Sequence, residues 1–467
     1  MIGHASRNSV LFDSVLLRRY DVAGPRYTSY PTAPRFHEGY NEQHYRENVR
    51  ESNGFPIPRP LSLYFHLPFC AHVCFYCACN KIITANRGRA ETYVDYLIRE
   101  LRMHAGLFDA DRFVNQIHWG GGTPTFLRPS LMTRLMKEIR DSFRLENDDA
   151  GEYSIEIDPR EATAETIGLL RDLGFNRLSV GIQDFNPLVQ AAVNRLQSFE
   201  ETAEVIHAAR DAGFRSVGVD LIYGLPYQTV PDFSRTLDKV LELNPDRIAA
   251  FNYAHLPGHF KSQRQIDELT LPSAEIKLDL LRQIIDQLTQ AGYDYIGMDH
   301  FARPHDDLAV ARREGVLHRN FQGYTTRGDC DLIGLGISSI GMMGESYQQN
   351  VRSLNEYYQY IDAGRIPIFR GYQLSLEDQL RRDIIMSLIC NFRLEFDNLE
   401  RRYGFDFNHY FAKELRQMAI MQDDGLLRLS DDSIEVTPAG RLLIRNICMV
   451  FDAYVQQNQN GGFSRTI

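Results

Sequence analysis

Short apolar runs alternate with amphipathic stretches along the first two thirds of the chain. The apolar runs are rich in β-branched and aromatic residues, and they lie at 61–69, 115–121, 152–158, 177–183, 216–224 and 247–255. Stretches with apolar residues three and four positions apart occupy 89–107, 129–143, 163–173, 199–212, 231–242 and 273–290. Nearly continuous apolar runs are typical of parallel strands buried on both faces, and the other spacing predicts helices. The pattern therefore predicts six strand–helix units joined by right-handed crossovers.

Six such units predict an α/β fold with an incomplete (β/α)6-type barrel rather than a full eightfold one. A further strand-like run at 293–302 would extend the sheet of this barrel. Residues 1–60 include "GPRYTSYPTAPRF", where prolines and aromatic residues replace any period, and they predict an ordered N-terminal arm. From about residue 370 the pattern becomes helical, beginning with a serine cap and an acidic first turn in "SLEDQLRRDIIMSLIC".

The C-terminal part also contains one predicted hairpin. "DGLLRLSDDSIEVTPAG" has two strand-like runs around polar turn residues, and "RLLIRNICMVFDAYVQQ" after it has the pattern of a helix. Helices combined with one hairpin predict a small winged-helix-like unit. We therefore expect an arm at 1–60, a catalytic barrel with an extension at 61–368, and a mostly helical C-terminal domain at 369–467.

Composition and charge narrow the class of protein. Of the 467 residues, 43% are hydrophobic and 11% are aromatic, which is enough to build a large core. The net charge of -10 disfavours a nucleic-acid partner, which would require a basic surface. No run approaches the roughly 20 apolar residues of a membrane helix, and no apolar segment before a cleavage site marks a signal peptide. We therefore expect a cytoplasmic enzyme without a membrane partner.

Four of the seven cysteines lie together in "CAHVCFYCACN" at 70–80. They are Cys70, Cys74, Cys77 and Cys79, whereas the other three are isolated. Clustered thiols, in a chain with too few cysteines for a disulfide scaffold, indicate metal ligation in a reducing compartment. A structural zinc site would need a second pair of ligands at similar spacing, which the sequence lacks. Three thiolates on a four-iron cluster, by contrast, leave one iron free to bind a small molecule.

The spacing Cys-x3-Cys-x2-Cys after the first predicted strand resembles that of radical S-adenosylmethionine (SAM) enzymes. "HWGGGTPTF" at the end of the second strand resembles the segment that contacts the methionyl amino group in that superfamily. Glycines lack a Cβ atom, so such a backbone can approach a ligand closely. The resemblance implies a 4Fe-4S cluster on Cys70, Cys74 and Cys77, with SAM bound to the fourth iron. It also implies that the reduced cluster cleaves SAM to a 5′-deoxyadenosyl radical, so the cofactors supply the difficult chemistry.

Motifs along nearly the whole chain narrow the resemblance to one family. The motifs run in order at compatible spacings from about residue 15 to the final "FSRTI". With Cys79 in a Cys-x-Cys position, the chain resembles oxygen-independent coproporphyrinogen III oxidases through "GPRYTSYPTA", "SIEIDPRE", "GFNRLSVGIQDFN", "DLIYGLPYQT", "FNYAHLP", "GMDHFARP", "HRNFQGYTT" and "GRLLIRNIC". The resemblance implies a radical SAM barrel that serves anaerobic haem biosynthesis. The implied reaction is oxidative decarboxylation of two propionates of coproporphyrinogen III to vinyl groups, which gives protoporphyrinogen IX.

The resemblance also assigns roles to individual residues. Contacts to the cluster-bound SAM are implied for Tyr64, Tyr76, Gly121, Glu156 and Ile340. Contacts to a second SAM molecule are implied for Gly122, Thr123, Gln183, Arg195, Asp220 and Ala254. Several of these residues lie near C-terminal ends of predicted strands, where barrels of this kind build active sites. Cys79 is expected to bind no iron, and either to act at the substrate or to pack beside the cluster.

A substrate with four carboxylates requires cationic or amide partners in an otherwise apolar pocket. Phe321 and Gln322 match positions that the family places near the substrate. Arg26, Arg303 and Arg319 lie in other family motifs and are hypotheses for carboxylate binding. The family further implies an electron donor such as flavodoxin or ferredoxin, an electron acceptor, and a monomer.

The polar residues also have structural alternatives. Glu156 and Asp158 would then pair with Arg160, Asp220 would cap a turn, and Arg195 would be an exposed helix residue. Two other functions are also open. One is a haem chaperone on the same radical SAM fold, a branch that lacks the Cys-x-Cys and the long arm. The other is a zinc-stabilised interaction protein with a winged-helix tail.

Overall fold

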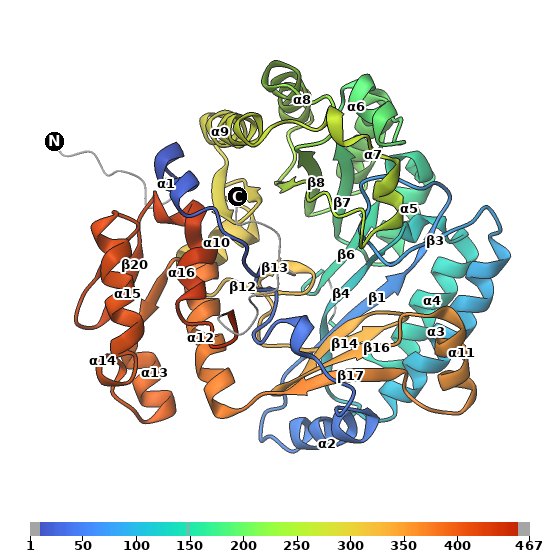
Figure 1. The fold of residues 1–467 in the computed structure, drawn as a ribbon. Helices are drawn as coiled ribbons and strands as arrows, with labels where there is room; N and C mark the ends of the chain where they lie inside the picture. Colours follow the sequence, from blue (N-terminus) through green and yellow to red (C-terminus); the bar gives the residue numbers. More distant parts are fainter. Residues whose placement is uncertain (1–9, 147–148, 456–467) are drawn as a thin grey trace.

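A computed structural model describes residues 10–146 and 149–455. Six parallel strands form the centre of the main sheet and pair in the order of the sequence (Figure 1). They are β1 (Leu61–Leu67), β4 (Phe113–Gly121), β6 (Glu152–Ile157), β7 (Arg177–Gln183), β8 (Ser216–Tyr223) and β9 (Arg247–Asn252). Each lies within three residues of its predicted run, so the incomplete barrel predicted from the apolar pattern is confirmed.

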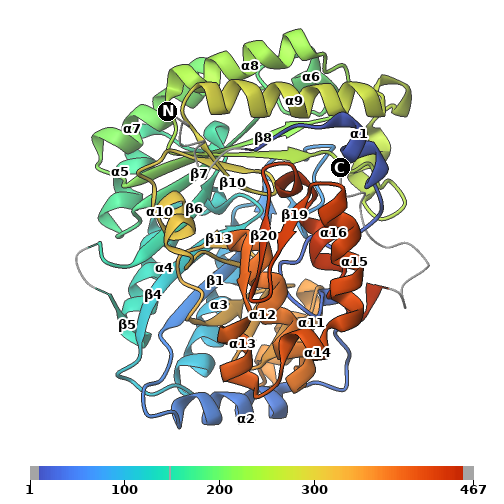
Figure 2. The ribbon, with the colours of Figure 1, turned by 90° about the vertical axis from the view of Figure 1, so that its left-hand side faces the viewer.

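The predicted helices follow these strands and cover the outer face of the sheet (Figure 2). They are α3 (Gly88–Ala105), α4 (Pro129–Ser142), α5 (Ala164–Asp172), α7 (Phe199–Asp211), α8 (Val230–Leu243) and α9 (Ala274–Gln290). Their apolar stripes pack against the strands in one continuous core. Shorter elements between them are β2 (Phe69–Cys70), β3 (Ile82–Ile83), β5 (Arg144–Leu145) and α6 (Pro187–Ala192).

The run at 293–302 extends the sheet, as predicted, but it forms two strands instead of one. They are β10 (Asp294–Gly297) and β11 (His300–Ala302), a hairpin in which β11 pairs antiparallel with β9. The chain reverses at Gly297 and Met298, which both have positive φ angles. At the other edge β14 (Asp331–Leu335) pairs parallel with β1, and three antiparallel strands follow it. These are β15 (Ile340–Met343), β16 (Ser346–Asn350) and β17 (Ile368–Gln373).

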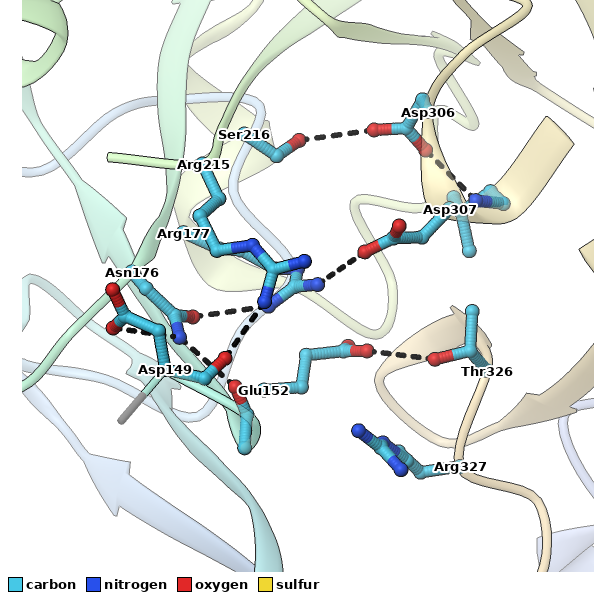
Figure 3. Close-up of polar contacts among 12 residues, drawn as sticks. Asp149, Glu152, Asn176, Arg177, Arg215, Ser216, Asp306, Asp307, Thr326 and Arg327 are labelled. Carbon is cyan, nitrogen blue, oxygen red and sulfur yellow. Dashed lines mark hydrogen bonds and ion pairs between the residues drawn. The ribbon is translucent and has the colours of Figure 1, made fainter. Parts of the chain in front are cut away.

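Polar contacts close one end of the barrel (Figure 3). At the N-terminal ends of the strands, Arg177 pairs with Asp307, and the Ser216 hydroxyl donates to Asp306 at 3.1 Å. Both aspartates lie at the start of α10 (Asp307–Glu314), and Glu152 accepts a bond from Thr326, which follows β13 (Gly323–Thr325). The opposite end, at the C-terminal ends of the strands, carries the cysteine loop.

Within residues 10–60, the N-terminal arm is ordered and contains two α-helices, α1 (Ser14–Arg19) and α2 (Glu42–Asn53). The second helix was not predicted, because its sequence is mostly polar. Between them the arm passes beside the C-terminal unit, where the Tyr27 hydroxyl donates to Asp452 at 2.9 Å. A bridge between His37 and Gly371 ties the arm to β17.

The C-terminal unit faces the inner side of the sheet (Figure 1). It contains α12 (Leu376–Asn391), β18 (Arg393–Glu395), α13 (Phe396–Tyr403), α14 (Phe407–Tyr410), α15 (Ala412–Asp423), β19 (Leu427–Leu429), β20 (Ser433–Val436) and α16 (Ile444–Met449). The predicted serine cap and hairpin are confirmed: Ser375 caps α12, and β19 pairs antiparallel with β20. The last predicted helix is shorter than expected, although its final two positions lie outside the described residues.

Three further elements connect the barrel to this unit. They are β12 (His318–Asn320), β13 (Gly323–Thr325) and α11 (Leu354–Asp362), and the first two form a short antiparallel hairpin. Among the helices of residues 10–146 and 149–455, none has the length and apolar character needed to cross a bilayer.

Candidate active site

The cysteine loop lies at the C-terminal end of β1. β2 pairs with β3 and closes the loop at its base, while the Phe75 amide donates to the Val193 carbonyl at 2.9 Å. Cys70, Cys74 and Cys77 line a single small pocket of about 170 Å³. The tertiary structure therefore brings the three thiols of the motif to one place.

Cys79 lines the same pocket. Its thiol hydrogen-bonds the Cys77 sulfur, which lowers the pKa of Cys77 despite the opposing effect of burial. The Lys81 ammonium donates to the Cys77 carbonyl at 2.9 Å and also favours the thiolate. Cys79 is therefore a direct neighbour of one motif cysteine.

The glycine turn at the C-terminal end of β4 forms the next wall of the pocket. A Cβ atom on Gly122 would lie 2.6 Å from the Pro68 carbonyl carbon, and one on Gly120 would lie 2.6 Å from Glu156 Oε1. Gly121 has a φ of +109°, and its amide donates to Glu156 Oε2 at 3.1 Å. Only glycine permits this close approach of three segments.

Glu156 is held by residues on the inner face of the sheet. His118 Nε2 donates to Glu156 Oε1 at 3.2 Å, while His118 Nδ1 bonds the Ser154 hydroxyl at 2.6 Å. The Tyr64 ring stacks on His118 with centroids 5.7 Å apart. Burial raises the pKa of Glu156, but the bonds from His118 and Gly121 outweigh it and keep the pKa below its usual value. Glu156 is therefore a positioned carboxylate anion.

Two arginines contact the cysteine loop on the other side. Arg160 and Arg195 both pair with Asp158, at 2.7 and 3.0 Å, and both donate to Cys74 Sγ, at 3.8 and 3.6 Å. The alternative of Arg195 as an exposed helix residue is wrong, because its side chain is buried. The alternative pairing of Asp158 with Arg160 is confirmed, while Glu156 binds His118 instead.

Asp220 lies deeper in the pocket on β8. It accepts a bond from the Ser179 hydroxyl at 2.9 Å rather than capping a turn. Burial raises the pKa of Asp220 to about 7, the charge of Glu156 adds to this effect, and Ser179, Arg195 and His118 oppose it. Gln183 follows at the end of β7 with a φ of +67°.

Replacing Asp220 by asparagine should change the pH dependence of stability. Because the folded pKa of Asp220 lies above its unfolded value, the neutral form stabilises the fold, and this stabilisation is lost as pH rises toward 7. The free energy of unfolding of the wild type should fall relative to Asp220→Asn by about 1.4 kcal/mol per pH unit between pH 5 and 7. Urea unfolding of the ligand-free protein at several pH values measures this slope, and parallel curves for the two proteins would contradict it.

Most residues expected to contact SAM lie in this pocket. Its lining includes Tyr76, Gly121, Gly122, Thr123, Glu156, Gln183, Arg195 and Asp220. Three lie outside the lining: Tyr64 stacks on His118, Ala254 is exposed after β9, and Ile340 packs beside Phe321 in a separate apolar cluster. His118, Ser179 and Gly181 were missed by the sequence analysis. The one available signal for His118 was its place as the first residue of the motif "HWGGGTPTF".

The residues expected to contact the substrate do not all lie together in the structure. Phe321 and Gln322 form the tip of the β12–β13 hairpin, where Phe321 packs against Tyr347 with centroids 5.8 Å apart. Arg26 pairs with Asp299, and the guanidinium of Arg319 lies over the Tyr324 ring.

Arg303 is not brought to this group, which corrects the sequence hypothesis for it. Its guanidinium donates to the Ala291 carbonyl at 2.8 Å and to Asn244. It also stacks on the Tyr293 ring, 4.0 Å from the centroid. These partners lie in the turns before β9 and β10, at the closed end of the barrel, so Arg303 connects loops there.

The pocket has the donor set of a thiolate-bound cluster. Within the described residues, no three cysteine, histidine or carboxylate side chains converge as ligands of a single metal ion. Three thiols instead surround a space beside a glycine turn that no Cβ can fill, with anionic and cationic side chains at its rim. The residues present therefore fit a multi-iron cluster with a small zwitterionic ligand.

Comparison with known proteins agrees with the fold and the pocket. Residues 64–240 match the Radical SAM superfamily, and residues 374–443 match the HemN C-terminal domain. The fold and the cysteine pocket define a radical SAM enzyme, a class that implies a 4Fe-4S cluster and SAM.

Two relatives and one solved structure identify the family within this class. The chain is 50% identical to the oxygen-independent coproporphyrinogen III oxidase of Pseudomonas aeruginosa, over 98% of this chain and 100% of the relative. It is 51% identical to the protein of the same name from Escherichia coli (strain K12), over 98% of both chains. The solved structure of coproporphyrinogen III oxidase (HemN) from Escherichia coli superposes with a TM-score of 0.91 at 50% identity, covering 96% of this chain and 100% of that one. The chain belongs to the oxygen-independent coproporphyrinogen III oxidase family.

Proposed function

We propose that this protein converts coproporphyrinogen III to protoporphyrinogen IX without oxygen, by oxidative decarboxylation of two propionate side chains. The observation that carries the proposal is the pocket in which three motif cysteines, the glycine turn and Glu156 meet. It lies in a chain that aligns over nearly its full length with relatives named for this activity. In anaerobic haem biosynthesis the reaction would need an electron donor such as flavodoxin or ferredoxin, and an electron acceptor.

The proposed roles follow the contacts in the pocket. Cys70, Cys74 and Cys77 would hold a 4Fe-4S cluster, and Glu156 with the Gly121 backbone would bind the amino group of SAM. When bound, these cofactors would supply a 5′-deoxyadenosyl radical that removes a β-hydrogen from a propionate, which then loses carbon dioxide and one electron. Arg195, Asp220, Gly122, Thr123 and Gln183 would bind a second SAM molecule.

His118 is proposed as a positioning residue for Glu156. Both of its ring nitrogens are hydrogen-bonded, so the imidazole fixes the carboxylate relative to the glycine turn. On the substrate side, Phe321 and Gln322 would contact the macrocycle, and Arg319 and Arg26 would attract its carboxylates. Cys79, beside Cys77, would take part in the later steps without binding iron.

An anaerobic turnover assay tests the proposal. The reduced, iron-loaded protein should cleave SAM to 5′-deoxyadenosine, and with coproporphyrinogen III it should release two molecules of carbon dioxide per protoporphyrinogen IX. Mass spectrometry of the porphyrin and trapping of carbon dioxide measure both products. SAM cleavage without decarboxylation would refute the substrate assignment, and haem binding without any turnover would favour a haem chaperone.

A further inference from the structure

A second cavity lies on the inner side of the sheet, apart from the cysteine pocket. Its volume is about 530 Å³, and none of its lining residues lines the cysteine pocket. One wall is the inner face of β1 and of β14 to β16, which contributes Ser62, Leu332, Met342 and Tyr347. The other wall comes from the β12–β13 hairpin and from α12 and α13 of the C-terminal unit.

The cavity is rich in arginine. Its charged lining comprises two aspartates, Asp329 and Asp383, and five arginines, which are Arg59, Arg319, Arg327, Arg382 and Arg402. Asp383 pairs with Arg402 at 2.7 Å, and the adjoining Glu345 pairs with Arg382 at 2.6 Å and with Arg59 at 3.5 Å. Five arginines facing three carboxylates leave the region with a net positive charge of two.

Arg319 provides the strongest evidence for an anion-binding site. Its side chain belongs to a residue that is only 9% exposed, and within the described part of the chain its Nε and Nη1 atoms have no hydrogen-bond partner. Arg327 Nε is likewise buried without a partner among the described residues, although Arg327 Nη2 donates to the Ala150 carbonyl at 2.8 Å. Buried guanidinium groups are normally paired, so this arrangement indicates a site for an anionic ligand.

Further cationic groups lie close to Arg319, and one of them, Arg26, is itself paired with Asp299. The pKa of Arg26 is lowered to about 10, mainly by burial and then by the nearby charges of Arg319 and Arg445. His300 is half-buried near the same group, and its pKa is depressed by burial and by Arg319 and Arg26. The rest of the lining combines polar residues with apolar ones, and the apolar residues include Leu317, Phe321 and Met386. Apolar surface beside a few buried cations suits a large ring that carries carboxylates.

The position of the cavity relative to Glu156 follows from the strand register. Ser62 pairs in register with Gln116, and His66 pairs with Gly120, beside which Glu156 lies. Ser62, in the cavity wall, and His66, at the height of Glu156, are four residues apart on β1. This separation corresponds to roughly 13 Å along the strand. The hairpin base lies at the same level, because Gln116 Nε2 donates to Thr325 Oγ1 at 3.0 Å. Figure 3 shows Thr326 and Arg327 just beyond it, at the closed end of the barrel.

We propose that Arg319, together with Arg327, binds the two carboxylates of the porphyrinogen that the reaction leaves in place. This inference rests on the proposed function. Two of the four propionates would have to reach the cysteine pocket, and the two that persist in the product lie on the other side of the macrocycle. Binding them in the second cavity orients the reacting side chains toward the cysteines, and it gives the C-terminal unit a direct part in the substrate site.

Comparing the affinities for two different porphyrins tests whether the arginines bind the retained carboxylates. Coproporphyrin III has four propionates, whereas mesoporphyrin IX has only the two that correspond to the retained ones. On the holoenzyme, Arg319→Gln should weaken the binding of both by a similar factor, about 10- to 100-fold for the loss of a charged hydrogen-bonding group. Arg327→Gln should weaken both in the same way. Fluorescence titration under anaerobic conditions measures the four dissociation constants against the wild type.

Matched variants separate recognition from folding. Arg428→Gln removes an arginine that is 73% exposed and does not line the cavity, and it should leave both affinities unchanged. Arg319→Lys keeps the charge without the planar fork, and it should bind both porphyrins with intermediate affinity and normal circular dichroism.

Three results would overturn the inference. A loss confined to coproporphyrin III would show that the arginines bind the reacting propionates instead. Unchanged affinities in an enzyme that still forms protoporphyrinogen IX would refute this inference while the proposed function stands. A wild-type protein that neither binds coproporphyrin III nor decarboxylates coproporphyrinogen III would refute both.

Discussion

Replacing Cys70 by alanine should abolish iron–sulfur cluster assembly and all SAM cleavage. Cys70 lies where β2 enters the loop and contributes one of three thiols to the pocket, and Thr123 donates to its sulfur at 3.6 Å. Two remaining thiolates cannot hold three irons of a four-iron cluster. Iron and sulfide content, the visible absorption of the anaerobically reconstituted protein and 5′-deoxyadenosine formation should all fall to background.

Cys79→Ser provides the matched control for this result. Cys79 lines the same pocket, but it is outside the three-cysteine spacing, so the serine variant should retain a full cluster. Its turnover of coproporphyrinogen III then distinguishes a chemical role of Cys79 from simple packing. A Cys70→Ala protein with four irons and four sulfides would contradict the ligand assignment.

Replacing Gly122 by alanine should also eliminate most of the activity, through geometry alone. The new methyl group would lie 2.6–2.7 Å from backbone atoms of Pro68 and Phe69, which directly precede Cys70. Backbone atoms cannot turn aside as a flexible side chain can, so the glycine turn and the cysteine loop must separate. We expect a loss of about 1–3 kcal/mol in the free energy of unfolding, as for other overpacked sites, together with poor cluster loading.

Gly168→Ala is the control for the second prediction. Gly168 lies in α5, and a Cβ atom there would meet nothing within 4 Å apart from the backbone of its own helix. This variant should retain the cluster and gain roughly 0.5–1 kcal/mol of stability, because alanine is the better helix residue. Equal stability and iron content in Gly122→Ala and Gly168→Ala would show that the close approach at Gly122 is not required.

The candidate site was predictable to the extent that it lies in local motifs. Cys70, Cys74 and Cys77 occur within eight residues, and the glycine turn is contiguous, so their proximity needed little tertiary information. The bond from His118 to Glu156 was not predictable, because it depends on the register between β4 and β6. The same limit explains Arg303, which lies in a family motif but contacts Asn244 and Ala291.

The edges of the fold show why some elements escaped the sequence pattern. β16, "SYQQN", is buried along its whole length although its residues are mostly polar, because Gln348, Gln349 and Asn350 bond to buried backbone and side-chain groups. Because its residues are mostly polar, β16 could not be predicted from a pattern of apolar residues. In contrast, the six central strands are apolar on the side that packs against helices, so the apolar pattern of the sequence predicted them.

By itself, the sequence determined the repeating strand–helix units, the cluster motif and the family. Apolar periodicity and short motifs depend only on residues that are close together in the sequence, so they can be recognised without the structure. The tertiary structure decided which distant side chains share a site: it placed Arg195 on Cys74, buried Arg319 without a carboxylate partner among the described residues, and set a second cavity against the C-terminal unit. Those relations depend on strand register and on how the hairpin and α12 pack, which no single stretch of sequence contains.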